Sequence, residues 1–330
     1  MVNSGNMKGP NGLRKPKIAI SMGDPNGIGP EILLKVLADP SVSANCDIVV
    51  VGSSRVLDFY CETPSGHGRI ETAEVDASGF DIRPGFIDGN AGRIAMVSVQ
   101  RAVELCQSGE VDAMVTCPIS KEAISLAGYD FPGHTEFIAD LLRSPDHLMM
   151  MVSDHLKIGM VTGHIPLSRV PQAITEENIL RTAHVMIRSL QHDFNIEHPH
   201  IAVLGLNPHA GDGGVLGPEE NQTILPAIKK AATEGLHVAG PFPADGFFGN
   251  STWKSFDGII AMYHDQGLIP FKALSFGAGV NFTAGLDIVR TSPDHGTAFN
   301  IAGSGVANAS SLKKAILCAI EVAQNRKKVQ

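Results

Sequence analysis

The sequence predicts an α/β protein whose doubly wound sheet forms two lobes, and three observations support this prediction. Short apolar runs alternate with amphipathic segments along the chain. Only 5% of the residues are aromatic, whereas 35 glycines and 20 prolines suit many tight turns around an aliphatic sheet. A length of 330 residues exceeds what one simple core needs, so one large or two medium units are expected.

Six brief apolar runs are predicted to be strands. They do not alternate with polar residues, which is typical of strands buried on both faces of a mostly parallel sheet. The runs are Lys17–Met22, Asp47–Val51, Ala113–Thr116, Lys157–Thr162, Ile201–Leu206 and Gly258–Met262.

Four segments with helical periodicity lie among these strands, at Ile32–Leu37, Gly92–Gly109, Thr175–Leu190 and Ser311–Gln324. We expect a disordered tail over 1–16. We expect a first lobe from 17–130 plus 285–330, and a second lobe over 131–284.

The composition argues against two classes of partner. A formal net charge of -8 indicates a protein that does not bind nucleic acid, and no apolar stretch is long enough for a membrane helix or a signal peptide. The five cysteines are scattered without a C-x-x-C pair, which is typical of free thiols in a reducing compartment. We therefore expect a cytoplasmic protein.

Three histidines follow predicted strands in similar contexts. His164 lies in MVTGHIP, His209 in LGLNPHAG and His264 in IAMYHDQG. Ligands of open α/β sheets collect at the carboxyl ends of strands. Three imidazoles there suit Zn, Co, Ni or Fe and leave positions open for substrate. The alternative is ordinary solvent-exposed histidines, because the chain contains 13 of them.

Two acidic residues accompany the histidines. Asp265 follows His264 directly, and Asp245 lies in the Gly-flanked segment FPADGFF. A carboxylate beside a ligating histidine can orient the ring or act as a base. For Asp245 the alternative is a residue that forms a turn.

Other polar residues are candidates for binding an anion. His134 and Thr135 in FPGHTEF lie on a turn ahead of a helix, where backbone N–H groups can meet an anion, although Thr135 is also a plausible helix cap. An apolar, Gly-rich stretch then carries Lys272, Asn281 and Arg290. Such cations can hold a phosphate and a carboxylate, and the alternative is an exposed strand with solvated charges.

The glycine loop Gly23–Glu31 (GDPNGIGPE) lies between a predicted strand and a predicted helix. It matches neither the Rossmann fingerprint nor the Walker A motif, and no strict match occurs elsewhere in the chain. If a dinucleotide binds, it binds through another motif.

Two sets of motifs resemble known families. HGTAFNIAGSGVAN (His295–Asn308) is similar to the adenosine-binding loop of the isocitrate and isopropylmalate dehydrogenases. The motifs GDPNGIGPE, TCPISKEA, FPGHTEF, VTGHIPL, LNPHAGDGG, ADGFF, YHDQGLIPFK and VNFTAGLDIVRTSPDHGTA resemble those of the 4-hydroxythreonine-4-phosphate dehydrogenases. This second resemblance covers the chain from Lys17 to its end.

The resemblance implies a two-lobed subunit with its active site in the cleft between the lobes and at a homodimer contact. It implies a divalent metal (Zn, Co or Mg) on His164, His209 and His264, contributed across the dimer. For the catalytic base of such a reaction the candidates in the sequence are Lys272, Asp245 and Asp265, and the sequence does not choose among them. The implied substrate-binding residues are His134, Thr135, Lys272, Asn281 and Arg290. The implied residues of the cofactor loop are His295, Gly296, Thr297, Ala298, Asn300 and Asn308.

The resemblance also implies a reaction: NAD or NADP oxidises 4-phosphooxy-L-threonine at C3, and decarboxylation then gives 3-amino-2-oxopropyl phosphate in pyridoxal phosphate synthesis. The position of Asn300 is often Asp in NAD-dependent relatives and Lys in NADP-dependent isocitrate dehydrogenases, so NAD is preferred. Three alternatives stay open. They are a dehydrogenase of 4-phospho-D-threonate or a related sugar acid, a three-histidine metal hydrolase, and a non-catalytic protein that binds phosphometabolites.

Overall fold

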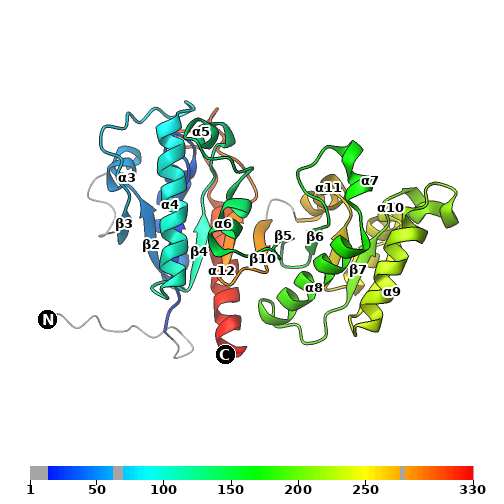
Figure 1. The fold of residues 1–330 in the computed structure, drawn as a ribbon. Coiled ribbons are helices and arrows are strands. Elements are labelled where there is room, and N and C mark those ends of the chain that lie inside the picture. The colour runs from blue at the N-terminus through cyan, green and yellow to red at the C-terminus, as the bar shows by residue number, and fades with distance from the viewer. Residues whose placement is uncertain (1–13, 62–69, 276–278, 330) are drawn as a thin grey trace. The chain divides into compact units, whose positions relative to one another are not determined.

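The computed structural model describes residues 14–61, 70–275 and 279–329, and the chain divides into two compact units (Figure 1). The first unit comprises Met1–Ser144 with Asp287–Gln324, and the second comprises Pro145–Leu286 with Asn325–Gln330. Most of the predicted tail over 1–16 lies outside the described residues, which begin at Arg14.

The first unit ends later than the predicted boundary after residue 130, because helix α6 (His134–Leu142) belongs to it. Phe137 of α6 packs edge-on against Tyr129 and Phe131, with ring centroids 5.8 and 5.2 Å apart. The helix also packs against α4 (Gly89–Gln107). His134 and Thr135 therefore lie in the first unit, whereas the boundaries predicted from the sequence place them in the second lobe.

The first unit contains five parallel strands in the order β3-β2-β1-β4-β11. The central strands are almost wholly buried, as their continuous apolar sequences predict. The strands are β1 (Lys17–Ser21), β2 (Asp47–Gly52), β3 (Thr72–Glu74), β4 (Ala113–Thr116) and β11 (Arg290–Pro293).

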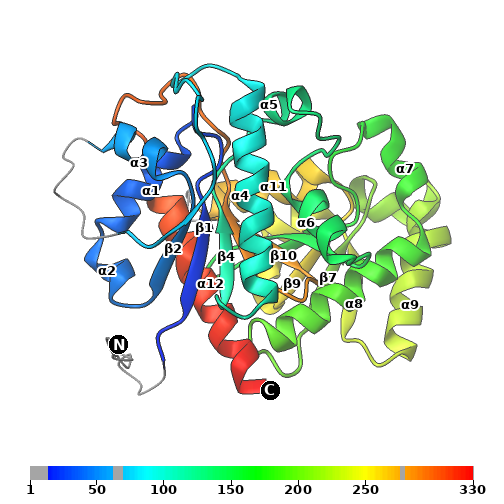
Figure 2. The same ribbon diagram turned by 60° about the vertical axis from the view of Figure 1, so that its left-hand side comes forward.

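Helices cover both faces of this sheet (Figure 2). Helix α4 packs across β1, β2 and β4 and buries Ile94, Met96 and Val99, and α12 passes behind the same strands. The remaining helices of the unit are α1 (Gly29–Leu37), α2 (Pro40–Ser43), α3 (Ser54–Tyr60) and α5 (Lys121–Leu126). Helix α12 (Ser310–Val329) contributes its residues up to Gln324 to this unit and the rest to the second.

The second unit orders its strands β10-β5-β6-β9-β7-β8. The pairs β6/β9, β9/β7 and β7/β8 are parallel, but β5 pairs antiparallel with both β6 and β10. The sequence predicted a mostly parallel sheet and did not identify this antiparallel part. The strands are β5 (Leu148–Val152), β6 (Lys157–Met160), β7 (Ile201–Leu204), β8 (Val238–Phe242), β9 (Gly258–Ala261) and β10 (Val280–Ala284).

Alternation along β6 assigns its two faces to different helices. Gly159 faces Met186 of α8 (Glu176–His192), and the neighbouring Ile158 and Met160 face Gly267 of α11 (His264–Ser275). The core on the α11 face is rich in aromatic residues, including Phe247, Trp253 and Phe271. The other helical segments are η1 (Leu167–Arg169), α7 (Val170–Ala173), η2 (Pro208–Gly214), the π-helical η3 (Glu220–Ile224), α9 (Leu225–Thr233), α10 (Ala244–Gly249) and η4 (Thr252–Ser255).

Helix α8 begins where the sequence indicated. The hydroxyl of Thr175 accepts a hydrogen bond from the backbone N–H of Asn178 at 3.2 Å, which satisfies one of the N–H groups that a helix start leaves open. Across the described residues, no helix is long and apolar enough to cross a membrane.

Candidate active site

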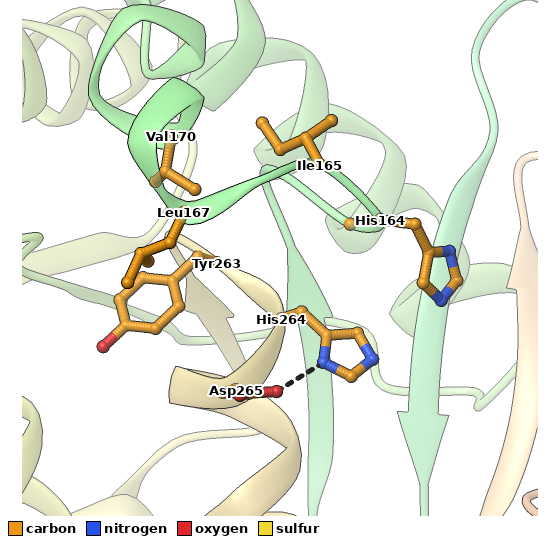
Figure 3. Close-up of a pocket in the computed structure, with 8 residues that line it drawn as sticks. His164, Ile165, Leu167, Val170, Tyr263, His264 and Asp265 are labelled. Atoms are coloured by element: carbon orange, nitrogen blue, oxygen red, sulfur yellow. Dashed lines mark hydrogen bonds and ion pairs between the residues drawn. The ribbon is translucent and has the colours of Figure 1, made fainter.

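His164 and His264 lie side by side in the second unit (Figure 3). The first follows β6 and the second begins α11 directly after β9, and these two strands are parallel neighbours. The Thr162 hydroxyl donates a buried hydrogen bond to the Met262 carbonyl at 2.8 Å, which ties the two strand ends together. As a result the two imidazole centroids are 5.4 Å apart.

Asp265 orients the second of these rings. Its Oδ1 lies 2.7 Å from Nδ1 of His264, and Figure 3 marks this contact. An ionised carboxylate only accepts hydrogen bonds, so Nδ1 is the donor in this contact, and in the neutral ring Nε2 keeps a lone pair for a ligand. The two histidines and Asp265 line a cavity of about 340 Å³, whose apolar wall includes Leu167, Val170 and Tyr263.

His209 lies on a different segment, η2, after the end of β7, and its side chain is exposed. Within the described ranges, no three His, Cys, Asp or Glu side chains lie close enough to hold a metal ion. The described part of the chain therefore brings together two of the three predicted ligands, and His209 stands apart from them.

The backbone around His209 is left-handed. Five consecutive residues, 209–213, have φ between 45° and 79°. Three of them, His209, Ala210 and Asp212, carry a Cβ. Such a conformation costs about 1–2 kcal/mol for each residue with a Cβ, so it persists only where its surroundings hold it. Gly211 is required here because an added Cβ would come within 2.5 Å of Oε2 of Glu220.

The carboxylate of Glu220 stabilises this left-handed turn. It is buried in η3, where its Oε1 accepts the backbone N–H of Asn207 at 2.7 Å and its Oε2 accepts Nδ2 of the same residue at 2.9 Å. Glu219 accepts a further hydrogen bond from Asn207 Nδ2 at 2.8 Å. Asn207 begins the turn, so the buried carboxylate sets the path of the backbone that carries His209.

Arg290 forms the centre of a polar cluster in the first unit. It begins β11 and is 2% exposed, so the alternative of a solvated surface strand is wrong for this residue. Its guanidinium donates to the hydroxyls of Thr116 at 2.8 Å and Thr135 at 3.4 Å. Burial lowers the pKa of Arg290 to about 10, which still leaves it charged at neutral pH.

His134 completes this cluster. It opens α6 beside Thr135, and its Nε2 is buried without a hydrogen-bond partner among the described residues. Burial holds the pKa of His134 well below its usual range, and the charge of Arg290 acts in the same direction, against a hydrogen bond with the Cys117 backbone. A neutral imidazole and two hydroxyls thus surround a buried cation, which suits an anionic ligand.

The predicted cofactor loop, His295–Asn308, also lies in the first unit and packs on the glycine loop. The backbone N–H of Ile28 donates to the Thr297 carbonyl at 3.0 Å, and a Cβ on Gly27 would lie 3.1 Å from the Thr297 Cβ. His295 has a buried Nε2 without a hydrogen-bond partner in the part of the chain that the structure describes. Asn300 is exposed, while Asn308 Oδ1 accepts the N–H of Ser310 at the start of α12.

Three further predicted residues belong to the second unit. Lys272 is exposed in the last turn of α11, and Asn281 on β10 has a buried Oδ1 without a hydrogen-bond partner among the described residues. Asp245 lies in the first turn of the short helix α10, so it does not form the turn considered as an alternative. The predicted substrate-binding residues are thus divided between the units, with His134, Thr135 and Arg290 in the first.

Asp24 is a candidate that the sequence analysis missed. It is fully buried in the glycine loop, its Oδ1 accepts the Asn26 N–H at 2.9 Å, and its Oδ2 has no hydrogen-bond partner among the described residues. Burial raises the pKa of Asp24 to about 6, with the Asn26 hydrogen bond opposing this and the Asp88 charge adding to it. An acid in a Gly- and Pro-rich loop directly after a buried strand was the available signal.

Comparison with known proteins identifies the family. Residues 44–319 match the model of the pyridoxal phosphate biosynthetic protein PdxA, which is most of the chain. The chain belongs to the PdxA family. It is 42% identical to a 4-hydroxythreonine-4-phosphate dehydrogenase of Bacteroides thetaiotaomicron, over 95% of this chain and 90% of that protein.

Solved structures of similar proteins have the same fold. A 4-hydroxythreonine-4-phosphate dehydrogenase from Klebsiella pneumoniae matches with a TM-score of 0.84 at 37% identity, over 94% of this chain and all of that one (100%). A terephthalate 1,2-cis-dihydrodiol dehydrogenase from Burkholderia xenovorans matches with a TM-score of 0.65 at 30% identity, over 93% and 98%. The predicted family and α/β fold class are confirmed, and the chain is an oxidoreductase of the PdxA family.

Proposed function

We propose that this PdxA-family chain oxidises 4-phosphooxy-L-threonine at C3 with NAD or NADP and that decarboxylation then yields 3-amino-2-oxopropyl phosphate, in the synthesis of pyridoxal phosphate. The observation that carries the proposal is the buried Arg290 with Thr135 and His134 at its side, a ready site for a phosphate in a chain of this family. Relatives at 42% identity carry the corresponding enzyme name.

Substrate binding is assigned to both units. Arg290 and Thr135 bind the phosphate, and His134 offers its buried Nε2 to a further polar group of the substrate. Asn281, whose Oδ1 is likewise buried and without a hydrogen-bond partner in the described ranges, accepts from a substrate N–H or O–H. Lys272 supplies a second positive charge for an anionic end. Fixing both ends of a small substrate determines which carbon faces the cofactor.

Proton transfer falls to Lys272 or Asp245. Of the three candidate bases, Asp265 is already bonded to Nδ1 of His264 and is better suited to orienting that ring. Lys272 and Asp245 are both exposed, and either is a candidate for taking the proton of the C3 hydroxyl, Asp245 as a carboxylate or Lys272 as a neutral amine in place of its role as a binding cation.

The histidines fit a divalent metal. Neutral imidazole suits Zn or Co, Mg is the remaining candidate, and the orientation of His264 by Asp265 is a usual arrangement around a ligating histidine. Such an ion supplies Lewis acidity for alkoxide and enolate oxygens. We assign His164, His209 and His264 as its ligands.

A homodimer is proposed because His209 stands apart from the other two ligands and exposed apolar side chains occur in the same unit. Leu167 is 70% exposed, Ile269 67% and Val215 80%. We also propose that the enzyme works in the cytoplasm, where the buried free thiols of Cys46 and Cys117 stay reduced. NAD is preferred over NADP, since Asn300 neither repels nor pairs with a 2′-phosphate.

The test follows reduction of NAD, and separately of NADP, by absorbance. Purified enzyme is offered 4-phosphooxy-L-threonine or 4-phospho-D-threonate, each with and without a chelator. Chelator-sensitive turnover of the first substrate alone is expected. Turnover of the second alone would move the enzyme to sugar-acid catabolism, and product formation without a dinucleotide would indicate a hydrolase. Binding of both phosphorylated acids without turnover would indicate a binding protein.

The metal assignment has its own variant. His209→Ala is expected to reduce both activity and bound metal, with activity falling at least about 100-fold. His198→Ala is the matched control, because His198 is also exposed and lies outside the proposed site. Unchanged metal content in the His209 variant, measured by elemental analysis, would contradict the assignment.

A further inference from the structure

We infer that Lys35, together with Glu31, is a positioning residue that holds the cofactor loop in its binding conformation and so sets the affinity for the dinucleotide. The inference rests on the proposed function, because it takes His295–Asn308 to be the dinucleotide-binding loop. It concerns residues of the first unit alone.

Three hydrogen bonds connect Lys35 and Glu31 of α1 to the distal part of this loop. The Lys35 ammonium donates to the carbonyls of Gly305 at 2.7 Å and Ala307 at 2.6 Å. Glu31 Oε1 accepts the backbone N–H of Ala307 at 2.8 Å and also accepts from Lys35 at 3.1 Å. The loop therefore meets a cation where it presents carbonyls and a carboxylate where it presents an N–H.

The loop needs such support because of its own composition. Gly303 and Gly305 both have positive φ, of 78° and 76°, and residues 303–306 are exposed. A glycine-rich exposed segment loses much conformational entropy when it is ordered, and that loss weakens binding unless it occurs on folding. Charge-assisted hydrogen bonds from a fixed helix provide this order in advance.

Helix α1 is a rigid base for this purpose, and it holds the loop at two places. Seven of its nine residues are buried, including Glu31. At the near end of the loop, Ile28, just before the helix, donates to the Thr297 carbonyl at 3.0 Å. At the far end Lys35 and Glu31 hold residues 305–307. One short element of structure thus fixes both ends of the segment that faces the cofactor.

The variant that tests this role is Lys35→Met, which keeps the aliphatic stem and removes the charge. Lys35 is exposed, with 39% of its side chain accessible, so the protein is expected to fold. We expect the Kd for NADH, measured by fluorescence, to rise about tenfold, which corresponds to about 1.4 kcal/mol. The KM for NAD should rise in parallel while kcat and the KM for the phosphorylated substrate stay near their original values.

A second readout needs no cofactor. The Ala307 N–H is bonded to Glu31, so hydrogen exchange over 303–307 in the cofactor-free protein should be faster in Lys35→Met than in the unchanged chain. Lys35→Arg, which keeps the charge and the donors, should restore most of the protection and affinity. Lys313→Met is the matched control, because Lys313 forms a similar half-exposed ion pair with Asp39 at 2.6 Å in the same unit.

The outcomes separate the two proposals. Unchanged exchange and unchanged NADH affinity in Lys35→Met, with normal binding by the unaltered enzyme, would overturn the role of Lys35 and leave the proposed function intact. Equal losses in Lys313→Met would indicate a general effect of removing a surface charge and would also overturn it. If the unaltered enzyme binds neither NADH nor NADPH, the proposed function fails and the positioning role falls with it.

Discussion

The two units prepare their candidate site residues in opposite ways. In the first unit the side chains are specialised: Arg290 is 2% exposed, and burial keeps His134 neutral and raises the pKa of Asp24 to about 6. In the second unit the backbone is specialised: five successive residues around His209 are left-handed, while the side chain of His264 is 34% exposed and that of His209 is exposed.

This difference indicates how each unit meets its ligand. A buried guanidinium with partners already in place is a preformed site, and its protonation states are set by the fold. Imidazoles that reach solvent from a fixed backbone can still rotate about their side-chain bonds, and they become ordered when a ligand binds them. We therefore expect substitutions in the first unit to act on charge and proton binding, and substitutions in the second to act on the stability of the turn that carries His209.

The largest effect is expected at Arg290. In Arg290→Met the phosphate loses its buried cation, so kcat/KM should fall about 1000-fold, or about 4 kcal/mol. The unfolding temperature should stay unchanged or rise, because a buried charge is replaced by an apolar side chain. Steady-state kinetics and thermal unfolding measure the two quantities. Arg101→Met, which removes an exposed partner of Glu104, is the control and should change neither.

A parallel loss of activity and stability in Arg290→Met would contradict the comparison. It would mean that the arginine holds the first unit together and is not a site prepared for a ligand.

The next largest effect is a pH dependence at Asp24. Because its pKa rises from 3.8 to about 6 on folding, the folded protein holds this proton more tightly than the unfolded chain. The contribution to stability is therefore complete below about pH 4 and is lost as the pH rises through about 6. A shift of roughly two units corresponds to about 3 kcal/mol.

Asp24→Asn isolates this contribution from other groups that titrate in the same range. The free energy of unfolding, from urea titrations at several pH values, is compared between Asp24→Asn and the unchanged chain. The variant should gain stability relative to the unchanged chain between about pH 4 and pH 6 and keep that gain above it. A difference that does not vary with pH would show that Asp24 titrates normally in the folded protein.

The sequence analysis predicted six strands, each from an uninterrupted apolar run, and missed five others, among them β5 (Leu148–Val152), which is itself an uninterrupted apolar run. All six predicted strands are present, with ends within two residues of the predicted ones, because burial on both faces requires a continuous apolar run. Strand β8 was missed because it contains Gly240 and Pro241, and β10 and β11 because they carry Asn281 and Arg290. Those two polar residues interrupt the apolar runs because they belong to the candidate site, and the sheet itself does not require them.

The candidate site was predictable where neighbouring strands bring residues together. His164 and His264 follow paired strands, so their proximity follows from their positions in the sequence. The left-handed turn was not predictable, because Ala210 and Asp212 disfavour positive φ and the turn depends on contacts with Glu220, which lies on another segment. The burial of Asp24 depends likewise on segments distant in sequence.

The smallest of the three effects is expected at Glu220, and it tests the second unit's side of the comparison. In Glu220→Gln one carboxylate oxygen becomes an amide donor that faces a donor of Asn207, so about 2 kcal/mol of stability should be lost. Hydrogen exchange and proteolysis should show the loosening confined to the turn around His209. Glu219→Gln is the matched control, because Glu219 is less buried than Glu220 and accepts a single hydrogen bond from the same Asn207, so this variant should lose much less stability. Equal losses in the two variants, or none in Glu220→Gln, would mean that the left-handed backbone is held by its own hydrogen bonds. In that case the second unit would not depend on a backbone held by a buried carboxylate, and the proposed difference between the two units would be wrong for the second unit.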